Sequence, residues 1–288
     1  MYGGIEAGGT KFVCAVADQS RDIIEKIKID TTTPEETMRQ VIDFFKQYHI
    51  KSLGVGSFGP IDINEKSDTF GYILTTPKSG WSQFDFLGYL KEYFDIPMYW
   101  TTDVHAAAYG EYMNATDNIK SCLYLTVGTG VGGGLVMDGE IVNGFNHPEM
   151  GHIIVKRHDE DNFEGSCPYH GDCLEGLASG SSLEKRLGRK GNTLETEDEV
   201  WDLVAYYIAQ ALVNYTLVVS PERIILGGGV MNQEHLIQKI RNQFIELNKL
   251  YVTHPAVDDY IQIPSLGSNA GIVGALSLAE KVLLENKI

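Results

Sequence analysis

The feature that most constrains the fold is a short pattern that occurs twice, at residues 3–16 and again at residues 122–137. Each copy combines a strand-like run, a glycine-rich turn that contains a threonine, and a second strand-like run. Two copies of one hairpin predict two lobes of similar build, each with its own sheet. A chain of 288 residues is long enough to form two such cores.

Helical segments are predicted between the strands, so the fold class is α/β. Thr33 precedes Pro34 and Glu36, which gives a capping residue, a proline at the first helical position and a capping-box glutamate. Apolar residues then recur at helical spacing, which predicts a helix over 34–48. Further helices are expected over 83–94, from Asp103 onward, and over 199–219, 232–248 and 269–285.

The composition excludes several classes of protein. A formal net charge of −16 argues against a nucleic-acid-binding surface, which needs clustered lysine and arginine. We find no apolar run long enough to predict a membrane span. Four cysteines in a chain of this length do not make a disulfide scaffold.

The second glycine turn, Gly128 to Gly133, matches the pattern G-x-G-x-x-G. A dinucleotide-binding site would need a helix directly after these glycines, whereas a strand and an Asp138-Gly139 hairpin turn follow here. No Walker-type phosphate loop is present in the sequence either. Glycine turns with a threonine can bring backbone N–H groups close to phosphate oxygens. They can also serve simply as tight turns, and the residues alone leave both interpretations open.

Asp103 stands where a strand gives way to a helix. A carboxylate there could accept the proton of an attacking hydroxyl during phosphoryl transfer. It could equally cap the helix, and local sequence does not decide between the two.

The segment Cys167-Pro168-Tyr169-His170-Gly171-Asp172-Cys173 supplies three metal-ligand side chains within seven residues, and His152 could be a fourth. Two cysteines and two histidines are an ordinary donor set for tetrahedral structural zinc. The alternative is a pair of free thiols with surface histidines. In a reducing compartment the pattern favours metal over a disulfide.

Together these motifs resemble the ROK family of sugar kinases, in the family's motif order along the whole chain. Glu6 to Lys11 resembles its first phosphate loop, Thr126 to Gly134 its second, and Leu226 to Val230 its adenosine turn. The resemblance implies a two-lobed actin/hexokinase-like (ribonuclease H-like) fold with a zinc-containing loop. It implies a small lobe over 1–110, onto which helix 269–285 packs back, and a large lobe over 111–268.

The family's functional residues carry over to matching positions of this sequence. The expected ATP-binding residues are Gly8, Gly9, Thr10, Lys11, Gly128, Thr129, Gly130, Gly132, Gly227, Gly228 and Gly229. Asp103 is the expected base, and the expected sugar ligands are Thr102, Asp103, Glu149, His152 and Glu175. The expected zinc ligands are His152, Cys167, His170 and Cys173.

Three positions depart from the family pattern. Glu6 replaces an aspartate thought to help hold magnesium, Thr102 replaces a sugar-binding asparagine, and His170 replaces a cysteine. His105 stands where asparagine is common and has no assigned chemistry.

The resemblance is strongest to the fructokinase branch, which implies phosphorylation of fructose with ATP, Mg²⁺ and a structural Zn²⁺. Mannose, glucose and N-acetylhexosamine remain alternative substrates, because hexoses present similar hydroxyl sets. A sugar-responsive regulator and an actin-like filament protein are the alternatives of other classes. We expect a cytoplasmic homodimer that binds neither nucleic acid nor membrane. Zinc is expected to support the sugar-binding carboxylates, with ATP binding at the distant glycine turns nearly independent of the metal.

Overall fold

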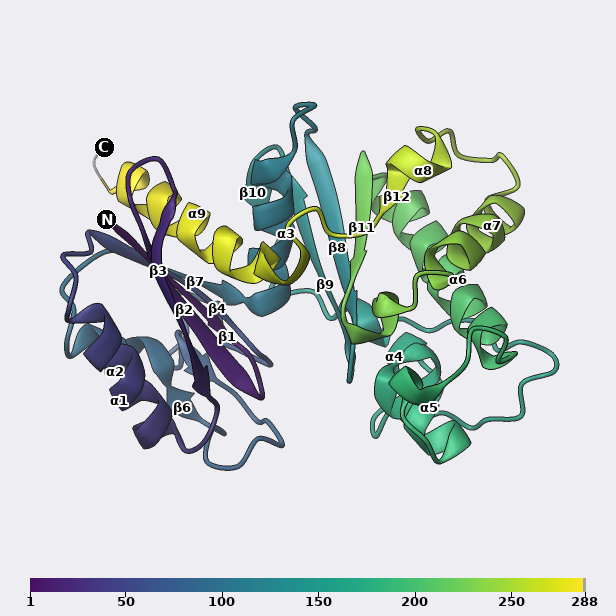
Figure 1. Ribbon diagram of the computed structural model, residues 1–288, viewed down its shortest axis with the longest axis horizontal. Coiled ribbons are helices and arrows are strands. Elements are labelled where there is room, and N and C mark those ends of the chain that lie inside the picture. Colours follow the sequence, from purple (N-terminus) through teal and green to yellow (C-terminus); the bar gives the residue numbers. More distant parts are fainter. Residues whose placement is uncertain (287–288) are drawn as a thin grey trace. The chain divides into compact units, whose positions relative to one another are not determined.

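The computed structural model describes residues 1–286 and divides the chain into two units (Figure 1). Unit 1 contains Met1–Thr116, Ile141–Pro148 and the chain from Ser268 onward. Unit 2 contains Asp117–Glu140 and Glu149–Gly267. Each unit is built around one mixed sheet, and each is described by itself.

The sheet of unit 1 has five strands in the order β3-β2-β1-β4-β7. They are β1 (Tyr2–Ala7), β2 (Lys11–Ala17), β3 (Ile23–Asp30), β4 (Ser52–Ser57) and β7 (Met98–Thr102). β1 and β2 form the antiparallel hairpin predicted from the sequence, whereas β4 pairs with β1 and β7 in parallel. The carboxyl ends of β1, β4 and β7 therefore lie at one edge of this sheet.

Helices cover both faces of this sheet. They are α1 (Pro34–Phe45), α2 (Phe86–Lys91), α3 (Asp103–Asn114) and α9 (Ala270–Glu285). β5 (Tyr72–Ile73) and β6 (Phe84–Asp85) form a separate two-stranded antiparallel sheet. α1 begins as predicted, because the Thr33 hydroxyl accepts the Glu36 N–H at 3.4 Å. It ends at Phe45, three residues before the predicted limit. α2 occupies the middle of the range predicted as helix at 83–94.

α9 lies against β4 and α3 at backbone distance. A Cβ atom on Gly54 would lie 1.9 Å from the Ala275 carbonyl oxygen, and one on Gly274 would lie 1.7 Å from that of Ala106. Glycine at both positions therefore allows the helix to approach this closely. The face of the unit 1 sheet that points away from α9 packs on an aromatic core, which includes Phe12, Phe45, Trp81, Phe86 and Trp100.

The sheet of unit 2 repeats this topology, with the strand order β10-β9-β8-β11-β12. The strands are β8 (Ser121–Val127), β9 (Val131–Met137), β10 (Glu140–Ile141), β11 (Arg223–Gly227) and β12 (Ile261–Gln262). β8 and β9 form an antiparallel hairpin, and β11 pairs with β8 and β12 in parallel. The internal repeat predicted from the two glycine turns is thus a repeat of sheet topology.

The helices of unit 2 are α4 (Leu174–Ala178), α5 (Gly180–Leu187), α6 (Val200–Val219), α7 (Leu236–Asn248) and α8 (Val257–Tyr260). Short 3₁₀ turns occur at η1 (Met150–His152), η2 (Gly191–Thr193) and η3 (Gly229–Asn232), with η4 (Gly267–Asn269) before α9. α6 and α9 match the predicted helices 199–219 and 269–285 closely. α7 begins four residues later than predicted, because η3 ends at Asn232 and residues 233–235 form a turn before the helix.

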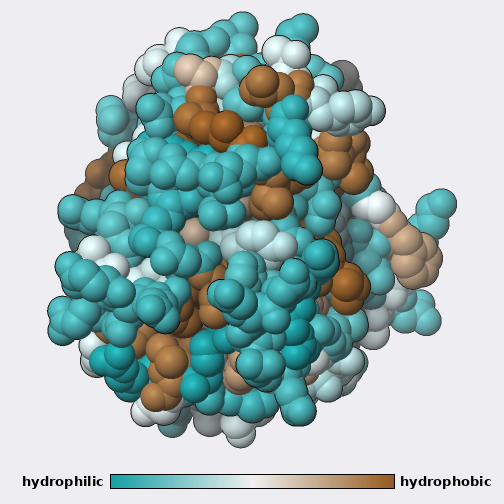
Figure 2. Space-filling model, turned by 90° about the vertical axis from the view of Figure 1, so that its right-hand side faces the viewer, coloured by the Kyte–Doolittle hydropathy of each residue, from teal (hydrophilic) through white to brown (hydrophobic). Residues whose placement is uncertain are grey.

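α6 is the one helix of residues 1–286 that is long and apolar enough to cross a membrane by length and composition. Half of its apolar window is buried inside the protein, and Trp201, Tyr207 and Leu212 are fully buried. This burial is typical of a core helix. The face in Figure 2 is mostly hydrophilic, and its hydrophobic residues lie in small separate groups.

Candidate functional site

The first glycine turn joins β1 to β2 in unit 1. The Gly8 N–H donates to the Lys11 carbonyl at 3.0 Å, and the Thr31 hydroxyl donates to the Gly8 carbonyl at 2.8 Å. Gly9, Thr10 and Lys11 are exposed, and a Cβ atom on Gly9 would meet no atom within 4 Å. The turn is therefore fixed from one side and open on the other, as an anion-binding turn requires.

Glu6 lies on β1 beside the start of α9. A Cβ atom on residue 271 would lie 2.6 Å from the Glu6 carboxyl carbon, so the glutamate fits because this residue is glycine. Burial raises the pKa of Glu6, while the charge of Lys11 and a hydrogen bond from the Ile272 backbone partly oppose this. Its Oε2 atom is buried and has no hydrogen-bond partner among residues 1–286. That oxygen is the Glu6 atom able to meet a cation or a water.

Asp103 is the first residue of α3, directly after β7. The helix cap is Thr102, whose hydroxyl accepts the His105 N–H at 3.2 Å. The Asp103 carboxylate accepts the N–H of the next residue at 2.9 Å. Capping of α3 is therefore assigned to Thr102, and the Asp103 side chain is partly exposed.

His105 and Thr102 form a buried pair beneath Asp103. The His105 ring is fully buried, and its Nδ1 atom lies 2.8 Å from the Thr102 hydroxyl oxygen. Burial lowers the pKa of His105 to about 3, with His147 adding to the shift and the Val142 backbone opposing it. The ring is thus neutral near pH 7, and the Thr102 hydroxyl is engaged by both the ring and the backbone of His105. A sugar contact by Thr102 stays a prediction.

The second glycine turn joins β8 to β9 in unit 2. The Gly128 N–H donates to the Gly130 carbonyl at 2.9 Å, and Gly132 lies within β9 opposite Thr126. The predicted strand follows the glycines, so the turn lacks the helix that a dinucleotide-binding fingerprint needs. Thr129 is exposed at the tip of this turn.

The third glycine turn follows β11 and lies beside the second. Gly228 has a φ of +92°, and a Cβ atom there would lie 2.5 Å from the Val127 carbonyl oxygen. Gly229 is exposed, and no atom lies within 4 Å of its Cβ position. Gly227 ends the strand. These contacts bring two of the three predicted nucleotide-binding turns together within one unit.

A cavity of about 570 Å³ opens just after the third turn. It is lined by Thr196, Asn232, Gln233, Glu234 and His235. The His235 ring packs edge-on against Trp201 at 5.6 Å between centroids, and its Nε2 atom is buried without a hydrogen-bond partner among residues 1–286. Sequence reasoning missed this cavity, because its lining comes from two segments that are far apart in the chain.

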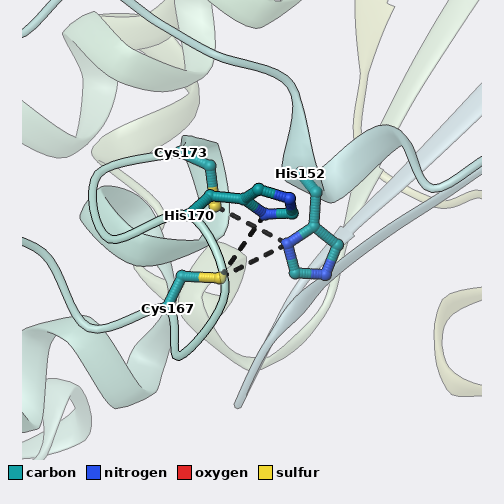
Figure 3. A group of neighbouring side chains, drawn as sticks. All are labelled: His152, Cys167, His170 and Cys173. Carbon is teal, nitrogen blue, oxygen red and sulfur yellow. Dashed lines mark hydrogen bonds between the residues drawn. The ribbon is translucent and has the colours of Figure 1, made fainter.

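Four metal-ligand side chains converge in unit 2, and they are the four predicted from the sequence (Figure 3). One ligand atom from each of His152, Cys167, His170 and Cys173 lies within 4.8 Å of all the others. Figure 3 shows the two thiols and the two imidazoles pointing toward a common centre.

The spacing within this His/Cys cluster suits a tetrahedral ion. Nδ1 of His152 lies 3.6 Å from each of the sulfur atoms of Cys167 and Cys173, and Nδ1 of His170 lies 3.8 Å from that of Cys167. Zinc bonds of about 2.3 Å to sulfur and about 2.0 Å to nitrogen give ligand separations of about 3.6 Å in a tetrahedron. Burial raises the pKa of the Cys173 thiol to about 11, so a bound cation would be needed to hold it as a thiolate.

The two predicted sugar-binding glutamates lie just before and just after the cluster residues in the chain. Glu149 is exposed and precedes η1, and its carbonyl accepts the His152 N–H at 3.0 Å. Glu175 lies on α4, where Oε1 is 3.9 Å from Nε2 of His152. The other oxygen, Oε2, accepts the Val131 N–H at 2.9 Å. The His152 ring therefore faces the thiols with one nitrogen and Glu175 with the other.

A buried ion pair elsewhere in unit 2 was also missed from the sequence. Asp161 bonds to Arg186 on α5 and accepts a hydrogen bond of 2.6 Å from the Tyr207 hydroxyl on α6. Burial alone would raise the pKa of Asp161, but these bonds lower it to about 2. These bonds connect the loop that precedes Cys167 to α5 and α6. No local sequence motif predicts them.

Comparison with known proteins gives the family. The model of the ROK family matches residues 2–282, so the chain belongs to the ROK family. It is 52% identical over 93% of its length to a fructokinase of Lactococcus lactis subsp. cremoris, 92% of which is covered. It is 48% identical to a fructokinase of Streptococcus mutans, and the match covers 98% of both chains.

The fold agrees with that assignment. The crystal structure of a ROK hexokinase from Thermus thermophilus superposes with a TM-score of 0.81 at 25% identity, covering 99% of both chains. The predicted α/β actin/hexokinase-like fold is therefore confirmed.

Proposed function

We propose that this protein transfers the γ-phosphoryl group of ATP to fructose and forms fructose 6-phosphate. The observation that carries the proposal is the near full-length identity to fructokinases, and the three glycine turns and the Asp103 carboxylate supply the kinds of group that phosphoryl transfer uses. Mannose, glucose and N-acetylhexosamine are the competing substrates.

Asp103 is the proposed general base. Its carboxylate is partly exposed at the end of β7, and the cap of α3 is supplied by Thr102 instead. It would accept the proton of the attacking sugar hydroxyl, while the turns at Gly8–Lys11 and Gly128–Gly132 donate N–H groups to the phosphates. The turn at Gly227–Gly229 and the cavity beside it would hold the adenosine.

Magnesium would accompany ATP and neutralise phosphate charge. Among the carboxylates near the first glycine turn, Glu6 is a candidate to meet the ion, either directly or through water. Its Oε2 atom has no other hydrogen-bond partner among residues 1–286. The extra methylene of glutamate, relative to the family's aspartate, is accommodated by Gly271.

We further propose that the His/Cys cluster holds one structural Zn²⁺ through His152, Cys167, His170 and Cys173. The donor set and the separations of 3.6–3.8 Å support this assignment. With four protein ligands the ion has no open position, so it would position Glu149, His152 and Glu175 toward the sugar and take no part in phosphoryl transfer. Metal analysis of protein purified without chelator tests this, with one zinc per chain expected.

A cytoplasmic location and a homodimeric state complete the proposal. No disulfide joins cysteines among residues 1–286, which suits a reducing compartment. Size-exclusion chromatography with light scattering tests the dimer.

The reaction is tested by identifying its product. After incubation with ATP, Mg²⁺ and fructose, ³¹P NMR should show a phosphate monoester that co-resonates with added fructose 6-phosphate. A fructose phosphorylated at another oxygen would reject the proposed product, and the absence of any new ester would reject fructose as the substrate.

A further inference from the structure

The metal cluster and the second glycine turn are joined by one short piece of chain. The linking segment, Cys173–Ser181, begins with a cluster residue and runs through α4 into the start of α5. Three side-chain or backbone bonds connect it to the turn between β8 and β9. The expectation that the glycine turn is distant from the metal site is therefore wrong.

Glu175 provides the first connection. Its Oε2 atom accepts the Val131 N–H at 2.9 Å, while its Oε1 atom lies 3.9 Å from Nε2 of His152. A Cβ atom on Gly130 would lie 2.6 Å from Oε2, so the turn passes directly over this carboxylate. A histidine that binds metal through one nitrogen and faces a carboxylate with the other is held in one orientation by both.

The start of α5 provides the other two connections. The Gly180 N–H donates to the Gly128 carbonyl at 2.7 Å, and the Ser181 N–H donates to the Thr129 carbonyl at 3.2 Å. Ser179 caps this helix by accepting the Ser182 N–H at 3.1 Å, and its own N–H donates to the Glu175 carbonyl at 3.2 Å. The conformation of the turn thus depends on where α4 and α5 begin.

The beginning of α4 depends in turn on the cluster. Cys173 directly precedes α4, its side chain is fully buried, and the Leu174 N–H donates to the Ile153 carbonyl at 3.0 Å, one residue after His152. An ion shared by His152 and Cys173 would fix both ends of this contact. Loss of the ion would free the His152 ring, and Glu175 would then lose a fixed partner.

We propose that the linking segment couples the metal cluster to the second glycine turn, so that Zn²⁺ and nucleotide each strengthen binding of the other, with Glu175 as the positioning residue. This inference rests on the proposed metal site and on the proposed role of the turn in ATP binding. It adds a role for Glu175 beside the predicted contact with sugar. Reciprocity follows from linkage, since two ligands that favour one conformation must raise each other's affinity by the same factor.

The test measures the effect of zinc on ADP affinity and the effect of ADP on zinc affinity, and neither measurement requires catalytic turnover. ADP affinity is measured by calorimetry on zinc-loaded and on chelator-stripped protein, and Zn²⁺ affinity is measured by competition with a chromogenic chelator, with and without ADP. We expect zinc to tighten ADP about 10-fold and ADP to tighten zinc by the same factor, within the usual range of such couplings.

Two variants locate the coupling. Glu175→Ala should still bind zinc, but each factor should fall to within about 2-fold of unity. Asp172→Asn changes the neighbouring carboxylate, which pairs with Arg157 at 2.8 Å, and should keep the full coupling. If Glu175→Ala fails to fold, hydrogen exchange on the wild-type protein replaces it: adding zinc should protect the amides of Val131, Gly180 and Ser181.

The possible outcomes distinguish failure of the coupling from failure of the metal site or of the proposed kinase activity. Protein that binds no zinc would overturn both the metal site and the coupling. Zinc binding with an ADP affinity that does not respond to it would overturn the coupling alone and leave the metal site and the kinase proposal intact. Full coupling in Glu175→Ala would reject Glu175 as the positioning residue.

Discussion

The two units share one sheet topology, yet their glycine turns are supported in different ways. Each turn joins the two antiparallel strands of its sheet, in the orders β3-β2-β1-β4-β7 and β10-β9-β8-β11-β12. A Cβ atom on Gly9 would meet nothing within 4 Å, whereas one on Gly130 would lie 2.6 Å from Glu175. The first turn is open, and the second is braced by a segment that also carries a metal-cluster residue.

The two units also differ in where their candidate functional residues lie relative to the shared sheet topology. In unit 1 the shared topology itself positions the candidate base, because Asp103 directly follows β7, the last strand of the sheet. In unit 2 the cluster and Glu175 lie between Glu149 and α6, whereas among the described residues of unit 1 only Thr31–Thr33 separate β3 from α1. Unit 1 should therefore control the chemical step, and unit 2 should control binding through its metal.

The largest expected effect comes from Asp103→Asn, which keeps the volume of the side chain but cannot accept a proton. Turnover with fructose should fall by about 10²–10⁴-fold, with fructose affinity changed much less. Steady-state rates and calorimetric fructose binding measure the two quantities. Asp43→Asn, an exposed change on α1, is the matched control. Near-normal turnover in folded Asp103→Asn would remove this residue from the mechanism.

The next effect belongs to unit 2. Cys173→Ser should lower zinc content and raise the fructose KM by about 10–100-fold, because the sugar-binding carboxylates lose their support. The ADP dissociation constant should rise about 10-fold if the linking segment acts as proposed. Cys14→Ala removes a buried thiol outside the cluster and should retain zinc. Full fructose affinity in a zinc-free variant would contradict the assignment of the two units.

The braced and open turns can be compared directly by stability. Gly130→Ala should lower the free energy of unfolding by about 1–3 kcal/mol, because the new methyl group overlaps the Glu175 carboxylate. Gly9→Ala should leave it unchanged or raise it by up to about 1 kcal/mol, because the methyl group enters open space. Urea unfolding of the ligand-free proteins measures both. Equal effects of the two substitutions would show that the turns are supported alike.

The smallest effect concerns the buried His105 pair in unit 1. The pKa of this ring is lowered from 6.5 to about 3, so the unfolded chain takes up a proton that the native protein does not as the pH falls below 6.5. This group should therefore remove about 1 kcal/mol of stability between pH 6.5 and 5.5 and have little effect on stability above pH 7. His105→Asn should show a shallower acid slope than wild type in the same zinc-loaded state. Identical slopes would mean that His105 is protonated in the native protein.

Local patterns predicted those parts of the molecule that depend on neighbours in the chain. The start of α1 followed from Thr33 and Pro34, and the cluster followed from the spacing of Cys167, His170 and Cys173. Contacts between distant segments were not predictable in this way. The bond from Val131 to Glu175 spans 44 residues, and nothing in the sequence around either residue signals it. Thr102, rather than Asp103, caps α3, and the sequence alone did not decide between these two neighbours.

The roles proposed for Asp103, the glycine turns and the metal cluster all serve hexose phosphorylation, and a coupled assay of ADP release over a panel of hexoses tests that reaction directly. With ATP and Mg²⁺, zinc-loaded wild-type protein should release ADP in a strictly sugar-dependent manner, with the highest kcat/KM for fructose among fructose, mannose, glucose and N-acetylhexosamines. A higher kcat/KM for another hexose would correct the substrate and leave the roles of the two units standing. ADP release that no hexose stimulates would contradict the assignment of this protein as a hexose kinase.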